Sequence, residues 1–262
     1  MELGLKGRIA FITGASRGIG LGIAEALARE GVHLALFGRD QAACAEVASG
    51  LRKQAPGVRA HSYVIDFERP ETIKPAVEAA ATELGGVDIL VNCAGGSKRG
   101  WINDLADEDW ERAFRVKPIG LMRMTRESLP FLKRSKQARV INISGNRGRE
   151  PRSSVMGGPI NLGTHSLTKA MANEFGKFGI TVNAVAPGFT KTRRWTEFLQ
   201  VGARDAGVSE SEYEKQLIAE IPMGRVLLPE DIADAVLFLA SARAGMITGT
   251  AIYVDGGNSR SI

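Results

Sequence analysis

The sequence lacks the features that are typical of metal-binding, disulfide-rich, nucleic-acid-binding and membrane proteins. Its 262 residues include two cysteines, Cys44 and Cys93, in no spacing typical of a metal site or a disulfide framework. Aromatic residues make up 6% of the chain and the net charge is +5, whereas a nucleic-acid-binding protein needs a clustered basic face with stacking rings. The chain has no apolar run of about 18 residues that would cross a membrane and no stretch typical of a secretory signal. We therefore expect a cytoplasmic protein with free thiols and no metal, whose partner is a small molecule rather than nucleic acid or a membrane.

Short apolar runs alternate with Ala-rich segments of helical period. The runs lie at residues 8–13, 33–37, 60–65, 88–93, 139–144, 180–186 and 251–254. Strands and helices in alternation require right-handed crossovers and a buried parallel sheet. The sequence therefore predicts a three-layer α/β fold, a Rossmann-type doubly wound parallel sheet, whose ligands bind at the carboxyl ends of the strands.

One segment interrupts this alternation. Residues 192–221 carry helical stretches but no strand pattern, and we expect them to form a small helical lid beside the substrate pocket. A single sheet with helices on both faces routinely uses about 250 residues. We therefore expect residues 1–262 to form one dinucleotide-binding domain that includes the lid.

The first predicted strand runs into a glycine-rich loop, TGASRGIG, at residues 13–20. Glycines in this loop let the backbone turn tightly and approach a pyrophosphate, whose charge is stabilised by the N-terminus of the next helix. A strand before the loop and a helix after it are the context in which this pattern binds a dinucleotide. The cofactor contacts expected from the loop are Gly14, Ser16, Arg17, Gly18, Ile19 and Gly20.

The residues after the second strand bear on the choice between NADP(H) and NAD(H). Position 38, close to where an acidic residue would bind the ribose hydroxyls of NAD, is glycine, and Arg39 follows it. Arg39 and Arg17 together can hold a 2′-phosphate, which favours NADP(H) over NAD(H). In the alternative interpretation both arginines are solvated and Asp40 binds the ribose, although Asp40 is more simply the N-cap of the next helix.

Together these motifs resemble the short-chain dehydrogenase/reductase family. The resemblance also rests on Asp66 after the third strand, NCAG at 92–95, Lys169 in its helix and NAVAPGFTKT at 183–192, and it covers essentially the whole chain. It implies a Rossmann-type fold, a nicotinamide cofactor and a homo-oligomer, either a tetramer or a dimer. The cofactor-binding positions that it implies beyond the glycine-rich loop are Asp66, Phe67, Asn92, Ala94, Gly95, Lys169, Pro187, Gly188 and Thr190.

The chain departs from the family at three of the four catalytic positions, Asn, Ser, Tyr and Lys. By the resemblance, Lys117 stands at the asparagine position, Gly145 at the serine position with Ser144 one residue earlier, and His165 at the tyrosine position. Lys169 alone is retained. The resemblance therefore implies an atypical member with a degenerate tetrad, whose candidate catalytic residues are Lys169, His165 and Ser144.

Histidine in place of tyrosine changes the acid chemistry. The pKa of a histidine starts near 6.5, and a neighbouring lysine lowers it further, so the imidazole is mostly neutral at pH 7 and is a weak acid. His165 is equally well interpreted as a helix cap or a pocket residue without an acid role. Asn161 or Thr164 can supply the missing hydrogen bond instead. Lys117 is either a solvated helix residue or points inward, where it needs an anion between it and a second lysine.

Basic residues cluster in three loops that open at the carboxyl edge of the predicted sheet. They are Lys98 and Arg99, then Arg147, Arg149 and Arg152, and then Lys191, Arg193 and Arg194. Guanidinium groups bind carboxylate and phosphate bidentately, so we expect an anionic substrate, carboxylate or CoA-linked. The alternative is that these are exposed loop charges. Trp101, Trp195 and Phe198 add an apolar wall or anchor the lid.

Two functions agree with these patterns. The first is an NADP(H)-dependent oxidoreductase that interconverts a carbonyl and an alcohol by hydride transfer, with His165 in place of the tyrosine. The second is an NADP(H)-binding pseudoenzyme that acts as a sensor, a carrier or an inactive subunit. We favour the enzyme because the motifs at the nicotinamide end are as complete as those at the adenine end.

Overall fold

A parallel sheet forms the centre of the molecule. A computed structural model describes residues 2–96, 98–151 and 156–261, and its strands follow the order β3-β2-β1-β4-β5-β6-β7, with every pairing parallel. The strands are β1 (Ile9–Thr13), β2 (His33–Gly38), β3 (Ala60–Val64), β4 (Ile89–Asn92), β5 (Arg139–Ile143), β6 (Thr181–Pro187) and β7 (Ala251–Val254). The order reverses between β1 and β4, and such a reversal opens a crevice at the carboxyl ends of the strands. The predicted Rossmann-type fold is confirmed.

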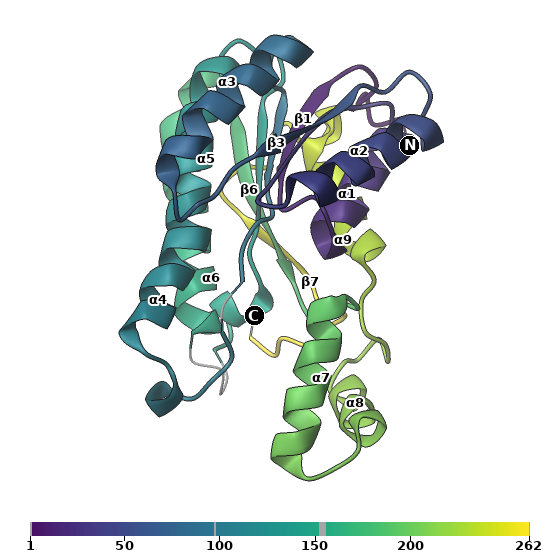
Figure 1. The fold of residues 1–262 in the computed structure, drawn as a ribbon, viewed down its shortest axis with the longest axis vertical. Coiled ribbons are helices and arrows are strands. Elements are labelled where there is room, and N and C mark those ends of the chain that lie inside the picture. The colour runs from purple at the N-terminus through teal and green to yellow at the C-terminus, as the bar shows by residue number, and fades with distance from the viewer. Residues whose placement is uncertain (1, 97, 152–155, 262) are drawn as a thin grey trace.

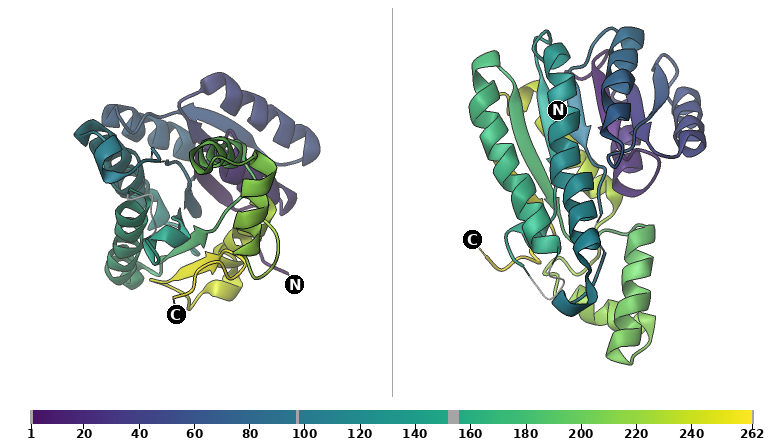
Figure 2. Two further views of the ribbon diagram at one scale, coloured as in Figure 1. Left: turned by 90° about the horizontal axis from the view of Figure 1, so that it is seen from below. Right: turned by 60° about the vertical axis from the view of Figure 1, so that its left-hand side comes forward.

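Helices cover both faces of the sheet (Figures 1 and 2). One face carries α1 (Gly18–Arg29), α2 (Gln41–Gln54) and α9 (Pro229–Ala240), and the other carries α3 (Ile73–Leu84), α5 (Gly120–Leu132) and α6 (Gly157–Phe175). The short helical turns are η1 (Pro70–Thr72), η2 (Ile102–Asp104), η4 (Asn146–Gly148), η5 (Gly176–Phe178) and η6 (Ala242–Ala244). None of the described helices is long and apolar enough to span a bilayer.

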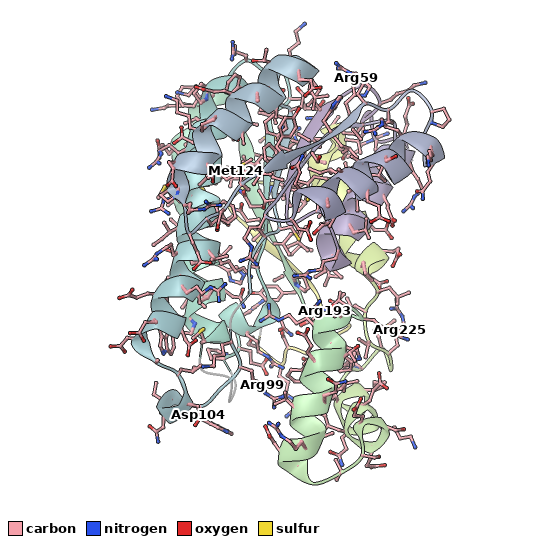
Figure 3. The ribbon with its side chains drawn as sticks, viewed as in Figure 1. Arg59, Arg99, Asp104, Met124, Arg193 and Arg225 are labelled. Atoms are coloured by element: carbon pink, nitrogen blue, oxygen red, sulfur yellow. The ribbon has the colours of Figure 1, made fainter. Side chains whose placement is uncertain are left out.

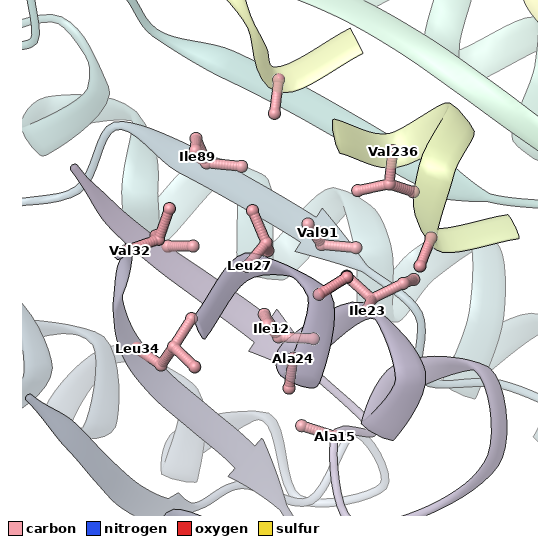
Figure 4. Packing of buried hydrophobic residues seen from close by; sticks show 14 of the residues in the cluster. Ile12, Ala15, Ile23, Ala24, Leu27, Val32, Leu34, Ile89, Val91 and Val236 are labelled. Carbon is pink, nitrogen blue, oxygen red and sulfur yellow. The ribbon is translucent and has the colours of Figure 1, made fainter. Parts of the chain in front are cut away.

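The larger part of the core lies between the sheet and the pair α1 and α9 (Figure 4). Helix α1 approaches α9 closely because Gly22 has no side chain: a Cβ there would lie 2.7 Å from the Cβ of Pro229. Ile23 and Leu27, one turn apart on α1, are fully buried with Ile12 of β1. Burial of these side chains fixes α1, and with it the glycine-rich loop that precedes it.

Truncation of Leu27 should destabilise this core strongly. Leu27→Ala removes a fully buried side chain and leaves a cavity, so we expect a loss of about 2–5 kcal/mol in the free energy of unfolding, measured by urea denaturation. Leu162→Ala is the matched control, since Leu162 is 55% exposed, and its expected change is within about 0.5 kcal/mol. Equal losses in the two variants would contradict the assignment of Leu27 to the core.

Two helices project beyond the sheet (Figure 1). They are α7 (Arg193–Ala206) and α8 (Glu210–Ala219), which fall in the segment 192–221 and follow β6. Aromatic rings tie α7 to the body: Trp195 and Phe198 stack at 5.7 Å, and each lies 5.3 Å from Phe189 after β6. Trp101, by contrast, is 63% exposed. Helix α4 (Asp107–Phe114) lies on the opposite side of the same end of the molecule.

Candidate active site

A pocket of about 270 Å³ opens at the carboxyl edge of the sheet. Loops or helix starts after β1, β4, β5 and β6 contribute to its wall, and α7 closes one side with Trp195 and Phe198. Ile19, Gly95, Pro187, Gly188 and Thr190 were predicted to bind the cofactor from distant parts of the sequence, and all of them line this pocket. The structure therefore brings these five residues together at one cavity.

The glycine-rich loop has a backbone that requires glycine. Gly14 and Gly18 have φ values of +70° and +57°, in the left-handed region. A Cβ at Gly20 would lie 2.2 Å from the carbonyl oxygen of Gly14, so a side chain there would break the turn. Because α1 starts at Gly18, its N-terminal amides face the loop, which fits the phosphates of a dinucleotide. Ser16 belongs to the same turn, and Arg17, the N-cap residue of α1, is exposed.

The end of β2 cannot hold an acidic side chain at residue 38. A Cβ on Gly38 would lie 2.7 Å from the sulfur of Cys44. The carboxylate of Asp40 caps α2, where its Oδ1 accepts a hydrogen bond of 3.0 Å from the amide of Ala43. Arg39 is exposed and its guanidinium lies 3.9 Å from Glu68, a loose contact that a phosphate can replace.

Two further predicted cofactor residues, Asp66 and Phe67, differ in how much of each is available to a ligand. Asp66 lies in a turn, where its carboxylate accepts from the amide of Glu68 and lies 3.6 Å from Arg69. The ring of Phe67 is buried against Gly120, so its backbone alone is left for a ligand.

The NCAG turn stands directly beside the glycine-rich loop. The side chain of Asn92 is buried and its amide donates to Thr125 and Asn142. Ala94 lies against Gly14, where a Cβ would be 2.9 Å from the Ala94 Cα. Asn92 thus holds the turn in place, Ala94 packs against the glycine-rich loop, and Gly95 lines the pocket itself.

Lys169 does not reach the pocket. It is exposed on α6, its side chain lies against Gly249, and it is not among the described residues that line the cavity. Gly157, at the pocket, is twelve residues earlier, which places Lys169 about 18 Å further along the helix axis. This placement does not agree with the predicted role of Lys169 at the nicotinamide ribose.

His165 lies behind the pocket. Its Nε2 is 2.7 Å from the Oγ of Ser144, and its ring packs edge-on against Tyr253. Ser144 donates its one hydroxyl proton to the carbonyl of Val185 at 3.1 Å, so the Nε2–H of His165 must be the donor to Ser144. Burial and the charge of Lys117 lower the pKa of His165 to about 4. The imidazole is thus neutral near pH 7 and committed to Ser144, which makes it a poor acid for a substrate.

The family's catalytic tyrosine and lysine are four residues apart, and two other residues with this spacing lie at the pocket. Gly157 and Asn161, one turn apart at the start of α6, both line the cavity. A Cβ at Gly145 would lie 2.8 Å from the amide nitrogen of Asn161, so that amide fills the space of the family's serine. Thr164, the other candidate donor, is buried and bonds the Ile160 carbonyl. At these two positions of α6, therefore, the chain has neither the tyrosine nor the lysine of the family pair.

Lys117 is, with Arg194, one of two cationic side chains among the described residues that line the pocket. It lies in the π-helical turn η3 (Arg115–Ile119), and Pro118, which has no N–H, interrupts the regular ladder there. The ammonium donates to the carbonyl of Ser144 at 2.8 Å and to Oδ1 of Asn161 at 2.7 Å. The Asn161 amide is itself oriented by a bond of 2.9 Å to the carbonyl of Gly157. An ammonium has three N–H donors, so the third is left for a ligand in the pocket.

The environment of Lys117 lowers its pKa to about 8, first through burial and then through the charge of Arg194. Cys93 also acts electrostatically on Lys117, and burial raises the pKa of its thiol to about 12. A lysine with a pKa near neutrality is able to give up and to take back a proton at physiological pH.

The basic loop residues separate into two groups. Arg194 lines the pocket, whereas the guanidinium groups of Arg99 and Arg147 lie over the rings of Phe198 and Phe189 outside it. Arg152 falls outside the described residues.

The chain is similar to known proteins along its whole length. The family described as enoyl-(acyl carrier protein) reductase matches residues 14–259. A 3-oxoacyl-(acyl-carrier-protein) reductase from Vibrio cholerae is 33% identical over 261 residues, which cover 97% of this chain and 98% of that protein. The chain belongs to the short-chain dehydrogenase/reductase family. These two matches confirm the family predicted from the motifs.

Solved structures of this family resemble the fold closely. L-sorbose reductase from Gluconobacter frateurii, complexed with NADPH and L-sorbose, has a TM-score of 0.94 with 31% identity, and the match covers 100% of both chains. An NADPH-bound short-chain oxidoreductase from Pseudomonas aeruginosa has a TM-score of 0.89 with 30% identity, over 97% of this chain and 98% of that one. That oxidoreductase is described as containing an atypical catalytic center.

The sequence contained a signal for which two positions of α6 lie at the pocket. In a parallel sheet, the helix after a strand starts at the carboxyl edge, so the first turns of α6 lie at the pocket. Lys169 lies twelve residues before Thr181, where β6 begins at the opposite edge. Counting back from that strand favours residues 157 and 161 over 165 and 169.

Proposed function

We propose that this protein is an NADP(H)-dependent oxidoreductase that interconverts a carbonyl and an alcohol, with Lys117 as the proton donor in place of the family's tyrosine. One observation carries the proposal: the ammonium of Lys117 lies at the pocket, held by Ser144 and Asn161, with one N–H left for a ligand. His165, the donor expected from the sequence, is turned toward Ser144 instead.

Lys117, Ser144 and Asn161 have different roles in the proposed reaction. Lys117 places its ammonium at the carbonyl oxygen of the substrate, stabilises the negative charge that develops there and transfers a proton to it. The Ser144 carbonyl and Oδ1 of Asn161 accept two hydrogen bonds from Lys117 and keep its Nζ in position throughout. Neutral Lys117 then regains a proton from solvent, and the reverse sequence serves alcohol oxidation.

A nicotinamide dinucleotide, when bound, supplies or accepts the hydride. The residues that would hold its phosphates are in the glycine-rich loop and the first turn of α1, which fit because the backbone of Gly14 and Gly18 is in the left-handed region. Pro187, Gly188 and Thr190 would hold the nicotinamide end. Trp195 and Phe198 shield that side of the pocket from water.

The preference for NADP(H) rests on the end of β2. Gly38 excludes an acidic side chain, Asp40 is engaged as a helix cap, and Arg39 with Arg17 stands exposed nearby. NADPH-bound structures among the relatives support the same choice.

Arg39→Ala should weaken NADPH binding and leave NADH binding unchanged. Loss of a charge-assisted bond to the 2′-phosphate raises the KM for NADPH roughly 10- to 100-fold. Steady-state kinetics with both cofactors would measure the effect. Arg29→Ala, at the opposite end of α1, is the control. A parallel rise of both KM values would contradict the assignment of Arg39 to the 2′-phosphate.

The substrate is proposed to carry an anionic group, carboxylate or CoA-linked, because Lys117 and Arg194 line the pocket. The pseudoenzyme alternative is favoured by one feature, the absence of a side chain at Gly157 where the family has its acid. Oxidation of NADPH in the presence of a panel of neutral, acidic and CoA-linked ketones tests both functions. Turnover that requires Lys117 supports the enzyme, and tight NADPH binding without turnover of any ketone supports the pseudoenzyme.

A further inference from the structure

Two cations flank one short stretch of backbone in the pocket. The side-chain carbons of Lys117 lie 3.0 Å from the Cβ position of Gly95, and Nη1 of Arg194 lies 2.6 Å from the Cβ position of Gly96. Adjacent residues have Cα atoms about 3.8 Å apart, so both cations fall within the length of a small molecule. Both also line the same cavity.

The two positive charges repel each other across the pocket. Burial lowers the pKa of Arg194, and the charge of Arg194 is the second cause of the lowered pKa of Lys117. The other titratable groups that act on this site are Glu197, whose charge raises the pKa of Arg194, Cys93, with its raised pKa, and His165, which is neutral near pH 7. No carboxylate among the described residues lines this cavity. A negative charge supplied by the ligand would therefore be stabilised by both cations.

We propose that Arg194 is the receptor for the carboxylate of a small oxo acid, whose carbonyl oxygen lies on Lys117, and that the bound carboxylate keeps Lys117 protonated. The proposal rests on the function proposed above and names its substrate class. The oxo acid is reduced at its carbonyl: the carbon gains a hydride from the reduced nicotinamide and the oxygen gains the proton of Lys117. The product is a hydroxy acid with its carboxylate unchanged.

The position of Arg194 selects a small acid over a CoA-linked one. A cavity of about 270 Å³ must also hold the nicotinamide ring, which leaves room for a short carbon chain. Arg194 lies inside this cavity and can bind a carboxylate bidentately. The phosphates of a CoA thioester would lie outside the pocket, beyond the reach of Arg194.

Calorimetric titration of the NADP⁺-loaded protein with acetoacetate tests the proposal without turnover. At pH 8.5 part of Lys117 is neutral in the free pocket, given its pKa of about 8, so binding should take up a fraction of a proton per site. Two buffers with different ionisation enthalpies measure this uptake. Arg194→Met should weaken acetoacetate binding at least about tenfold and abolish the uptake.

Arg193→Met is the matched control, since Arg193, labelled in Figure 3, starts the same helix. Its side chain is exposed and pairs with Glu197 at 2.9 Å, and unlike Arg194 it is not among the described residues that line the pocket. It should bind acetoacetate like the native protein. Neutral acetoacetamide should bind both arginine variants equally, which shows that the Arg194→Met pocket is intact. Equal acetoacetate binding by Arg194→Met and Arg193→Met would overturn the proposal. So would acetoacetate binding that NADP⁺ competes away, because Arg194 would then serve a cofactor phosphate.

The outcome is separable from that of the proposed function. Lys117→Met tests the proton donor by turnover, whereas Arg194→Met tests the receptor by binding. Loss of acetoacetate binding in Arg194→Met, together with full turnover in Lys117→Met, would retain the receptor and reject Lys117 as the donor.

Discussion

Lys117→Met is expected to lower kcat for NADPH-dependent ketone reduction by about 10³-fold, since it removes both the proton donor and the charge that stabilises the developing alkoxide. Methionine has a similar length and no charge, so the pocket keeps its shape. The dissociation constant for NADPH should stay within about threefold, because Lys117 bonds Ser144 and Asn161 rather than the glycine-rich loop. Single-turnover kinetics and a fluorescence titration of NADPH would give the two numbers.

Lys169→Met is the matched control for this loss. It makes the same change on the exposed face of α6, so kcat should stay within about twofold of the native value. If Lys169→Met abolished turnover while Lys117→Met did not, the family's lysine role would return to Lys169. The assignment of Lys117 would then be wrong.

The second large effect is the pH dependence of reduction. Reduction needs protonated Lys117, whose pKa is lowered to about 8, so kcat/KM should be flat below that pH and fall tenfold per unit above it. At pH 10 the loss is about 100-fold. Alcohol oxidation needs the neutral amine, so its kcat/KM should rise with pH and level off above about 8. A neutral ketone is the appropriate substrate, because an oxo acid adds its own charge to the site.

Lys117→Arg separates this titration from other pH effects. A guanidinium stays protonated throughout this range, so the alkaline fall should disappear, although a poorer acid lowers the plateau. His165 serves as a second check. Its pKa of about 4 predicts no change in rate near pH 6.5. An inflection near pH 6.5 that His165→Ala removes would instead identify His165 as the donor.

The cofactor half of the site was readable from the sequence because its determinants are local. Gly14, Gly18 and Gly20 act through backbone conformation, which a residue and its neighbours decide. Strand and helix periods likewise gave the order of layers. The residues at 187–190 follow a strand, and the ends of parallel strands meet at one edge.

The reacting groups were not readable in the same way. His165 and Lys169 match the family's spacing, in which the lysine follows the catalytic residue by four positions. Lys169 lies too far from the start of α6, however, to line the pocket. Lys117 appears in the sequence as an ordinary helix residue. Its inward position depends on the π-turn at Pro118 and on the space that Gly145 leaves for Asn161.

The sequence by itself determined the fold class, the dinucleotide loop and the family, because short-range periodicity and glycine conformation are properties of the local chain. The tertiary structure alone decided that Lys117, Asn161 and Arg194 share a pocket. These three residues come from the turn before α5, the start of α6 and the start of α7. Burial shifts the pKa values of Lys117 and Arg194 only after the sheet has brought those elements to one edge.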